Sequence, residues 1–283
     1  MECTFEQMIS IVIPAYNESA VIKRALHGIT EGAHVGELDV IVVCNGCTDE
    51  TAQLARQFGS PVRVIETVTG NKPYALNLGD AASGSTYPRV YMDADVVLSI
   101  QDLRAIASKL DRGDILAAAP MGRVVVNGCG LLARWYYEIA ALMPSSQGGI
   151  GAGVYALSHE GRRRFGQFPN IIADDMYVWL NFNSQERETI ASAKATVFNP
   201  SKLRDILRIK TRSKRGNRQL ARAFPYLWAT RQSNHQTIVT LFKHLGLWPK
   251  LVVYCAVVGT AQAAACWPAG RKGYRWLRDN STR

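Results

Sequence analysis

The N-terminal part of the chain alternates between short apolar runs and segments whose apolar residues recur at helical spacing. Residues 9–13 (ISIVI) form a continuous β-branched run, which is typical of a strand buried on both faces. Similar runs predict strands at 38–43, 62–65 and 88–92, and helical spacing predicts helices at 17–29, 48–58 and 73–83, with Asn17 and Thr48 as candidate caps. Repeated strand–helix–strand units predict an α/β fold with a mostly parallel sheet flanked by helices.

Polar residues come directly after three of these predicted strands. Asn17 and Glu18 follow the first strand, residues 45–49 follow the second, and Asp93 to Asp95 follow the fourth. Ligands of such sheets bind beyond the carboxyl ends of the strands. We therefore expect these polar segments to meet around a ligand.

The pattern is less regular in the rest of the chain. We expect a helix at 130–143, a glycine-rich loop at 147–153, a strand at 154–158 and a helix at 174–182. The composition changes near residue 200. The sequence therefore predicts a catalytic domain at 1–200 and a basic, partly apolar and helical C-terminal region at 201–283.

Charge is distributed unevenly between these two parts. The formal net charge is +10, but residues 201–283 alone carry 17 Lys or Arg and only two acids, Asp205 and Asp279. Residues 1–200 are acidic by comparison, with a net charge of −5. This asymmetry predicts a polyanionic partner for the C-terminal part, which could be nucleic acid, an anionic membrane surface or a diphosphate.

Two pairs of carboxylates are candidates for chemistry. Asp93 and Asp95 flank one alanine after a buried strand, where they could hold a hard divalent cation beside a diphosphate; the alternative is a solvated acidic turn. Asp174 and Asp175 begin a predicted helix. There they could stabilise the helix N-terminus, or one of them could act as a general base. Lys72, near another helix N-terminus, could meet a phosphate or lie on the surface.

Six short motifs follow one another along the chain: residues 11–18 (IVIPAYNE), 45–51 (NGCTDET), 71–77 (NKPYALN), 93–95 (DAD), 151–153 (GAG) and 174–175 (DD). In this order and spacing they resemble family 2 glycosyltransferases, over residues 9–220. The resemblance implies the GT-A fold. It also implies an enzyme that moves a sugar from a nucleoside-diphosphate sugar to an acceptor hydroxyl and inverts the anomeric configuration.

The resemblance also implies roles in donor binding. The nucleoside pocket would be lined by Pro14, Ala15, Tyr16 and Glu18. Asn45 stands where the family often has an aspartate that reads the base, and Lys72 would lie beside the nucleotide. A UDP-sugar is the first donor to expect.

The remaining implied roles concern the metal and the reaction. Asp95 would be the main ligand of Mn²⁺ or Mg²⁺, with Asp93 beside it. Asp175 matches the second acid of the family's acidic pair, the catalytic base, and Arg215 and Arg218 lie where a basic segment approaches the diphosphate. The Gln-x-x-Arg-Trp pattern of processive synthases is missing from this segment, which favours the addition of a single sugar.

An apolar stretch at residues 245–268 is about as long as a minimal membrane span of roughly 17–25 residues. Trp248 and Trp267 bracket it, as interface aromatics do. It could be a buried helix, a helix on the membrane surface or a span. A membrane surface would suit a lipid-linked acceptor.

The N-terminus carries no pattern of a secretory signal, and the six cysteines are scattered. We therefore expect free thiols and a cytoplasmic protein, peripheral on the inner face of the membrane. Cys44 and Cys47 have the spacing of a zinc or redox pair, but no second pair follows.

Two other functions compete with glycosyl transfer. A nucleotidyltransferase would also use paired acids, but it needs a glycine- and basic-rich loop after its first strand, where residues 14–18 read PAYNE. A nucleic-acid-binding module would use the basic stretch, but aromatic residues do not interleave with its charges. We therefore expect no nucleic-acid partner.

Overall fold

The computed structural model describes residues 8–125, 128–143, 152–231 and 234–267. The chain divides into two compact units. The first unit comprises Met1–Arg123, Gly149–Asn170 and Asn181–Val197, and the second comprises Val124–Gly148, Ile171–Leu180 and Phe198–Arg283. The expected domain division at residue 200 stays a prediction.

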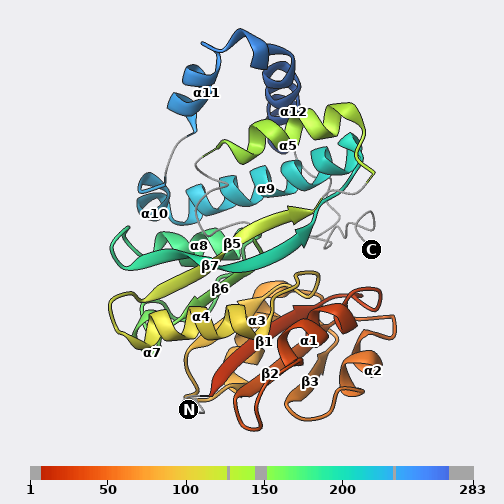
Figure 1. The fold of residues 1–283 in the computed structure, drawn as a ribbon, viewed down its shortest axis with the longest axis vertical. Helices are drawn as coiled ribbons and strands as arrows, with labels where there is room; N and C mark the ends of the chain where they lie inside the picture. The colour runs from red at the N-terminus through yellow and green to blue at the C-terminus, as the bar shows by residue number, and fades with distance from the viewer. Residues whose placement is uncertain (1–7, 126–127, 144–151, 232–233, 268–283) are drawn as a thin grey trace. The chain divides into compact units, whose positions relative to one another are not determined.

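A seven-stranded sheet forms the centre of the first unit (Figure 1). Its strand order is β3-β2-β1-β4-β6-β5-β7, and the pairs among β1 to β4 are parallel, whereas β6 pairs antiparallel with both β4 and β5. The strands are β1 (Ile9–Ala15), β2 (Leu38–Asn45), β3 (Val62–Thr67), β4 (Arg89–Met92), β5 (Ala117–Val125), β6 (Val154–Leu157) and β7 (Arg187–Phe198). The fold class is thus the mostly parallel α/β sheet that the alternating pattern predicts.

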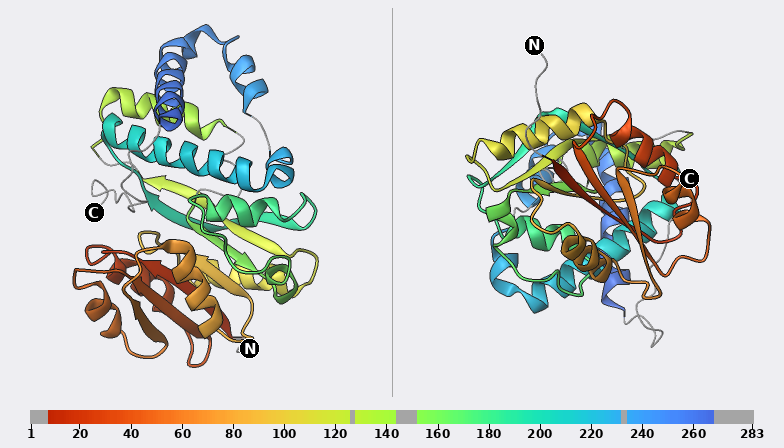
Figure 2. Two further views of the ribbon diagram at one scale, coloured as in Figure 1. Left: turned by 180° about the vertical axis from the view of Figure 1, so that it is seen from behind. Right: turned by 90° about the horizontal axis from the view of Figure 1, so that it is seen from below.

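Helices cover both faces of this sheet. Ile9, Ile11 and Ile13 of β1 pack in the main core with apolar residues of α1 (Ile22–Thr30), α2 (Thr51–Arg56) and α4 (Ile100–Asp111). On the other face, Ile41 and Val43 of β2 pack against α3 (Lys72–Ala82), which lies toward the viewer in the left panel of Figure 2. Because a strand's side chains alternate between faces, a run that is apolar at every position can serve both layers.

Both candidate helix caps, Asn17 and Thr48, are wrong. The helix expected from Asn17 begins at Ile22, and the helix expected from Thr48 begins at Thr51. Asn17 instead adopts a left-handed φ of 55°, and its side-chain Oδ1 accepts a hydrogen bond of 2.7 Å from the backbone N–H of Thr48. The two residues therefore join the loops after β1 and β2, because their polar groups find partners across the loops.

The second unit is helical. Its elements are α5 (Leu131–Ala141), α8 (Asp174–Leu180), α9 (Leu203–Ala223), α10 (Pro225–Ala229), α11 (His235–Leu241), the 3₁₀ turn η1 (Leu245–Leu247) and α12 (Trp248–Cys266). α12 packs on both α5 and α9, as Figure 2 shows from behind. Tyr136 of α5 stacks on Tyr254 of α12 in a core that also contains Ile206 of α9. Among the described residues, Leu245–Cys266 is the one helical stretch whose length and composition would allow a membrane crossing, and 28% of its most apolar window is buried.

Candidate active site

The loops after β1 and β2 are held together at the carboxyl edge of the sheet. Cys47 donates its thiol hydrogen to the carbonyl oxygen of Ala15 at 3.3 Å, and the backbone N–H of Glu18 donates to Thr51 Oγ1 at 2.7 Å. Pro14 and Ala15 are buried, and Tyr16 is half-buried. The side chains of Glu18 and Asn45 are almost inaccessible at this edge, with residue exposures of 7% and 3%. The structure thus gathers the residues expected around the nucleoside.

Asp49 fastens these two loops, a role that the sequence reasoning did not single out. Its carboxylate accepts hydrogen bonds from the backbone N–H groups of Ser19, at 3.2 Å, and Thr51, at 3.1 Å. Burial raises the pKa of Asp49, but the hydrogen bonds from Thr51 and Ser19 outweigh that effect and hold its pKa below the ordinary value. An Asp carboxylate four residues after the end of a buried strand is the one sequence signal for this role.

Asp93 directly follows β4, and Lys72 begins α3. The side chain of Asn71 caps this helix by accepting from the N–H of Tyr74 at 2.9 Å, and Pro73 occupies its first turn. This start places Lys72 Nζ 2.8 Å from Asp93 Oδ1. Two residues that the sequence assigned separately to nucleotide and metal are therefore neighbours.

Gly153 directly precedes β6, the strand that pairs with β4, and contacts Asp93 from there. Its carbonyl accepts the N–H of Asp93 at 2.8 Å, and its φ is +66°. A Cβ added to Gly153 would lie 3.0 Å from Asp93 Oδ2 and 2.8 Å from Val96 Cγ2. Of the glycine-rich loop, Gly148 to Gly151 lie outside the described residues, but Gly153 is needed for the close approach of this loop to the acidic turn.

Asp93 and Asp95 fit a divalent cation by their chemistry. Both are half-buried on the turn after β4, and hard cations such as Mg²⁺ and Mn²⁺ prefer carboxylate oxygens. The ion pair with Lys72 shows that Asp93 already attracts a cation. The described residues contain no group of three or more His, Cys, Asp or Glu able to hold a metal, so these two acids would need ligands from a diphosphate and water to complete a site.

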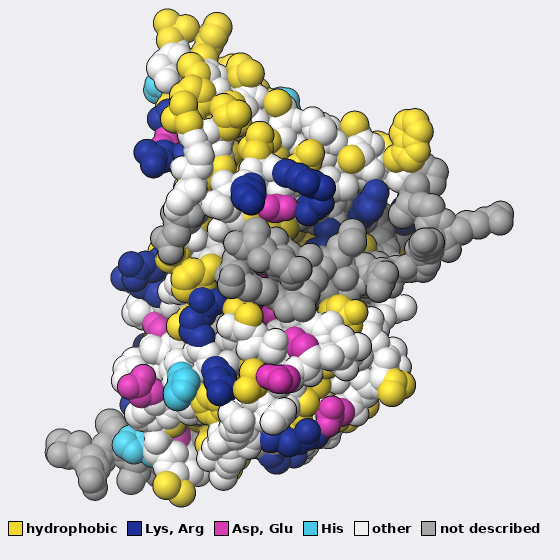
Figure 3. Space-filling view, turned by 90° about the vertical axis from the view of Figure 1, so that its right-hand side faces the viewer, with side chains coloured by type: hydrophobic (Ala, Val, Ile, Leu, Met, Phe, Trp, Pro, Cys, Tyr) yellow, Lys and Arg dark blue, Asp and Glu magenta, His cyan; other side chains and the backbone are white. Residues whose placement is uncertain are grey.

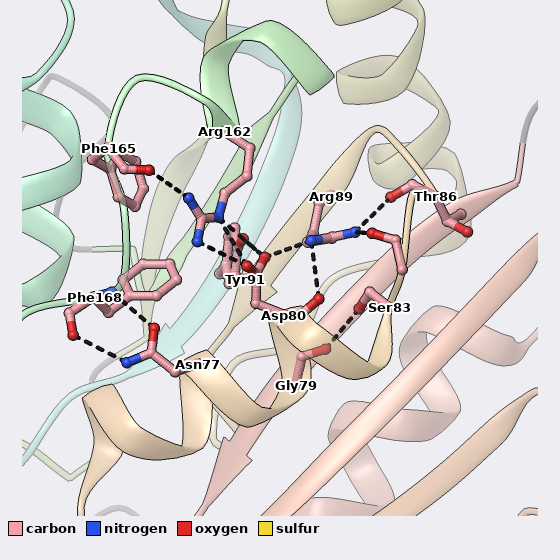
Figure 4. Close-up of polar contacts among 11 residues, drawn as sticks. Asn77, Gly79, Asp80, Ser83, Thr86, Arg89, Tyr91, Arg162, Phe165 and Phe168 are labelled. Atoms are coloured by element: carbon pink, nitrogen blue, oxygen red, sulfur yellow. Dashed lines mark hydrogen bonds and ion pairs between the residues drawn. The ribbon is translucent and has the colours of Figure 1, made fainter.

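A buried ionic network centred on Asp80 holds α3, the helix that begins at Lys72, in place (Figure 4). Asp80 accepts hydrogen bonds from Arg89 at 2.5 Å, from the Tyr91 hydroxyl at 2.5 Å and from Arg162 at 2.8 Å. Burial raises the pKa of Asp80, but these donors outweigh it and hold the pKa below its ordinary value. The network ties α3 to β4 and to the short helix α7 (His159–Arg162).

The same face of α3 also holds the segment that follows α7. Asn77 makes two hydrogen bonds with the backbone of Phe168, with its Nδ2 donating at 3.1 Å and its Oδ1 accepting at 2.8 Å. Asn71 Nδ2 donates to Asn170 Oδ1 at 2.7 Å. The helix that presents Lys72 is therefore anchored along its length.

Cys44 and Cys47 are free thiols at the end of β2 and in the loop that follows. A hydrogen bond from the Cys44 thiol lowers the pKa of Cys47 to about 7, while the same contact and burial raise the pKa of Cys44. Cys129, Cys255 and Cys266 are also free, and Cys3 lies outside the described residues. The expectation of free thiols holds for the described cysteines.

The second unit contains the other expected residues. Asp174 and Asp175 form the first turn of α8, where Asp174 is 3% exposed and Asp175 is half-buried. The side chain of Gln219 in α9 accepts the N–H of Ile172 at 3.0 Å. A Cβ added to Gly216 would lie 3.0 Å from Ile172 Cβ. The basic helix α9 therefore packs directly against the residues that lead into the acidic pair.

The two arginines of this segment differ in their surroundings. Arg215 donates from its guanidinium to the carbonyl oxygen of Ala264 in α12 at 3.3 Å, so its side chain reaches toward α12. Arg218 is half-buried on the same helix. Within the second unit, the structure thus brings Asp175 and the basic segment onto neighbouring elements.

Comparison with known proteins gives this arrangement a context. The model of glycosyl transferase family 2 matches residues 10–165. A 4,4'-diaponeurosporenoate glycosyltransferase of Staphylococcus aureus is 28% identical over 189 residues, which are 64% of this chain and 48% of the relative. The chain thus spans about half the length of the curated relatives that it matches.

Two solved structures are similar in fold. A mannosyltransferase of Pyrobaculum calidifontis in complex with GDP-Man and Mn²⁺ has a TM-score of 0.66 at 17% identity, over 93% of this chain and 88% of the other. Glucosyl-3-phosphoglycerate synthase of Mycobacterium tuberculosis has a TM-score of 0.54 at 21% identity, over 77% and 81% of the two chains. At these identities the likeness establishes a shared fold.

Proposed function

Because the chain belongs to glycosyl transferase family 2 and has the GT-A fold, we propose that it is a metal-dependent, inverting enzyme that transfers a sugar from a nucleoside-diphosphate sugar to an acceptor hydroxyl. The observation that carries this proposal is the pairing of Lys72 with Asp93 at the carboxyl end of β4. β1 lies between β2 and β4, so this pair lies where the strand order reverses. Ligands of open α/β sheets bind at such a point.

The donor nucleoside would be bound by the loops after β1 and β2. Pro14, Ala15 and Tyr16 would form its apolar contacts, and Glu18 and Asn45 would supply polar ones. A UDP-sugar is the first donor to test. A GDP-sugar is the second, because the Pyrobaculum enzyme of similar fold is complexed with GDP-Man and because the neutral amide of Asn45 can both donate and accept.

Asp93 and Asp95 would hold Mn²⁺ or Mg²⁺. When bound, the metal neutralises the negative charge that builds up on the departing diphosphate. Lys72 would add a second positive charge beside the same group, because its ammonium already lies at Asp93. The presence of Mn²⁺ in the Pyrobaculum complex makes Mn²⁺ the first ion to test.

Asp175 is the proposed general base. Its carboxylate would accept the proton of the acceptor hydroxyl while that oxygen attacks the anomeric carbon from the face opposite the leaving nucleoside diphosphate. Attack from the opposite face inverts the anomeric configuration. Arg218, and Arg215 if it leaves Ala264, would provide further positive charge for the diphosphate.

The acceptor is proposed to be a lipid or a lipid-linked molecule at the inner face of the cytoplasmic membrane. Two observations support this proposal. The staphylococcal relative is named for 4,4'-diaponeurosporenoate, and the C-terminal 83 residues carry 17 basic residues and two acids. Anionic membrane surfaces attract such basic segments by about 1 kcal/mol per residue.

A panel of nucleotide sugars tests the proposed reaction. The purified chain is incubated with UDP- and GDP-sugars, with Mn²⁺ or with a chelator, and release of the nucleoside diphosphate is measured. We expect release from one donor that depends on the metal and is lost in Asp95→Asn. Absence of release from every donor, or release that ignores the chelator, would contradict the proposal.

A further inference from the structure

The outward face of α12 is uncharged along its whole length. Its buried residues recur every three or four positions, so one face packs on α5 and α9. The opposite face exposes Trp248, Val252, Ala256, Thr260, Ala263 and Trp267. No charged residue occurs between Lys250 and Arg271. An exposed helix face of a water-facing protein normally carries charges, so this face needs another environment.

Large exposed apolar side chains continue this face onto the segment before α12. Leu245 is 73% exposed, Trp248 49% and Val252 63%, and Val239 and Phe242 are exposed beside them in the chain. The indole N–H of Trp248 donates to the carbonyl oxygen of Phe242 at 2.9 Å, which fixes the ring at this end of the helix. Figure 3 shows hydrophobic side chains gathered over the upper part of the view, with Lys and Arg side chains and a few acidic ones beside them.

The segment that carries this apolar surface contains basic residues but no acidic ones. No Asp or Glu occurs between Asp205 and Asp279, so α11, η1 and α12 contain no acid. Lys243 is exposed next to Phe242, and Lys250 pairs with Glu138 of α5 at 2.5 Å. An apolar strip beside cationic side chains is complementary to a bilayer with anionic headgroups.

The packing of α12 distinguishes a helix on the membrane from one through it. Leu251, Tyr254 and Val257 are buried in the core that α12 shares with α5 and α9. Crossing the bilayer would strip these residues of their partners. A helix that lies in the plane of the interface keeps them and immerses the outward face.

We propose that α12, together with Phe242 and Leu245, lies flat on an anionic bilayer, with Trp248 and Trp267 at the two ends of the immersed strip. This docking adds to the proposed function. Its purpose, which is to reach a lipid acceptor, rests on that function. The binding itself needs no transfer reaction, so the two can fail separately.

Vesicle flotation tests the docking with the full chain. The vesicles contain phosphatidylglycerol and phosphatidylcholine, or phosphatidylcholine alone. We expect the wild-type chain to float with the anionic vesicles, less so at high salt. Val252→Asp should lower the partition coefficient by about tenfold or more, because it removes an immersed apolar side chain and adds a charge of the wrong sign.

Val35→Asp is the matched control. Val35 is fully exposed in the first unit, so the same substitution there should leave flotation unchanged. Thermal unfolding of both variants should match the wild type, since neither side chain is buried. Asp95→Asn should still float, and Val252→Asp should still release nucleoside diphosphate in vesicle-free buffer.

Three results would overturn the docking. The wild-type chain could stay at the bottom of the gradient with anionic vesicles. Val252→Asp could float as well as the wild type, or no worse than Val35→Asp. Finally, a wild-type dimer that Val252→Asp converts to a monomer would assign this face to a second copy of the chain.

Discussion

Lys72 Nζ lies 2.8 Å from Asp93 Oδ1, at the point where α3 begins and β4 ends. The lysine is the more sheltered partner, with 14% of its side chain exposed against 38% for Asp93. Lys72 is thus a counter-cation of the acidic turn. If Asp93 and Asp95 hold a divalent cation, that cation and Lys72 would both supply positive charge beside a bound diphosphate.

Lys72→Met is expected to weaken the binding of UDP or GDP roughly ten- to a hundredfold, because a charged hydrogen bond to phosphate is lost. The same change should strengthen Mn²⁺ binding without nucleotide, since the competing ammonium is gone. Titration calorimetry measures both affinities. Lys109→Met is the matched control, because Lys109 pairs with Glu188 on the surface at 3.2 Å; an identical effect of the two substitutions would refute the role of Lys72.

Asp175→Asn is expected to retain donor binding and to lose at least about 10²-fold in transfer, because an amide cannot accept the proton. Asp174 is 3% exposed, so Asp174→Asn should chiefly lower the thermal unfolding temperature. Rates of transfer and unfolding curves of both variants separate the two roles. An active Asp175→Asn beside a stable, inactive Asp174→Asn would move the base to Asp174.

Cys47 is expected to react selectively with iodoacetamide. Its pKa of about 7, lowered by the hydrogen bond from Cys44, means that the thiolate fraction rises with pH, reaches one half near pH 7 and levels off about one pH unit or more above that. Peptide mass spectrometry gives the rate at each cysteine, with the exposed Cys266 as the internal reference. Bound nucleotide should protect Cys47 but not Cys266, because Cys47 contacts Ala15 in the loops that we propose to bind the nucleoside. Equal rates at both sites, or no protection, would contradict the geometry of this loop.

Asp80→Asn is expected to destabilise the chain by about 3–5 kcal/mol, because it leaves Arg89 and Arg162 without their counter-ion in a buried site. The folded-state pKa of Asp80 is depressed. Its stabilisation is therefore complete above the unfolded pKa of about 3.9 and is lost as the pH falls through the lower folded value.

Urea unfolding between neutral and acidic pH measures both effects. The variant should lack the part of the acid-induced loss that Asp80 contributes. Asp39→Asn breaks the more exposed pair with Arg63 and should cost about 1 kcal/mol or less. Equal costs for the two substitutions would show that the Asp80 network does not stabilise α3.

The parts of the fold that follow from local pattern were predictable. β1, β2 and α3 appear within two residues of their predicted bounds, because the runs of the two strands are apolar toward both faces of the sheet and the buried residues of α3 recur at helical spacing. β7 (Arg187–Phe198) was not predicted, since only Ile190, Ala193 and Ala195 of it are buried and its charged residues hide any alternation. The antiparallel direction of β6 depends on its pairing with β4, which no local pattern encodes.

The residues of the candidate site likewise include some that the local sequence predicts and some that it does not. The acids after β4 could be read from the sequence because they follow a buried strand. The Asp80 network could not, because Arg162 lies 82 residues away in the chain and nothing local links the two. Asn17 and Thr48 were mistaken for caps because the same polar side chains that cap helices also join loops.

The most direct test of the central claim is titration of UDP and GDP into the wild-type chain and Asp95→Asn, each with Mn²⁺ and with a chelator. The account predicts that one nucleotide binds the wild type at least about tenfold, or roughly 1.4 kcal/mol, more tightly with Mn²⁺. It predicts that Asp95→Asn loses this gain while unfolding at the wild-type temperature. Equal affinity with and without Mn²⁺, or an undiminished gain in Asp95→Asn, would contradict a metal-dependent donor site at Asp93 and Asp95.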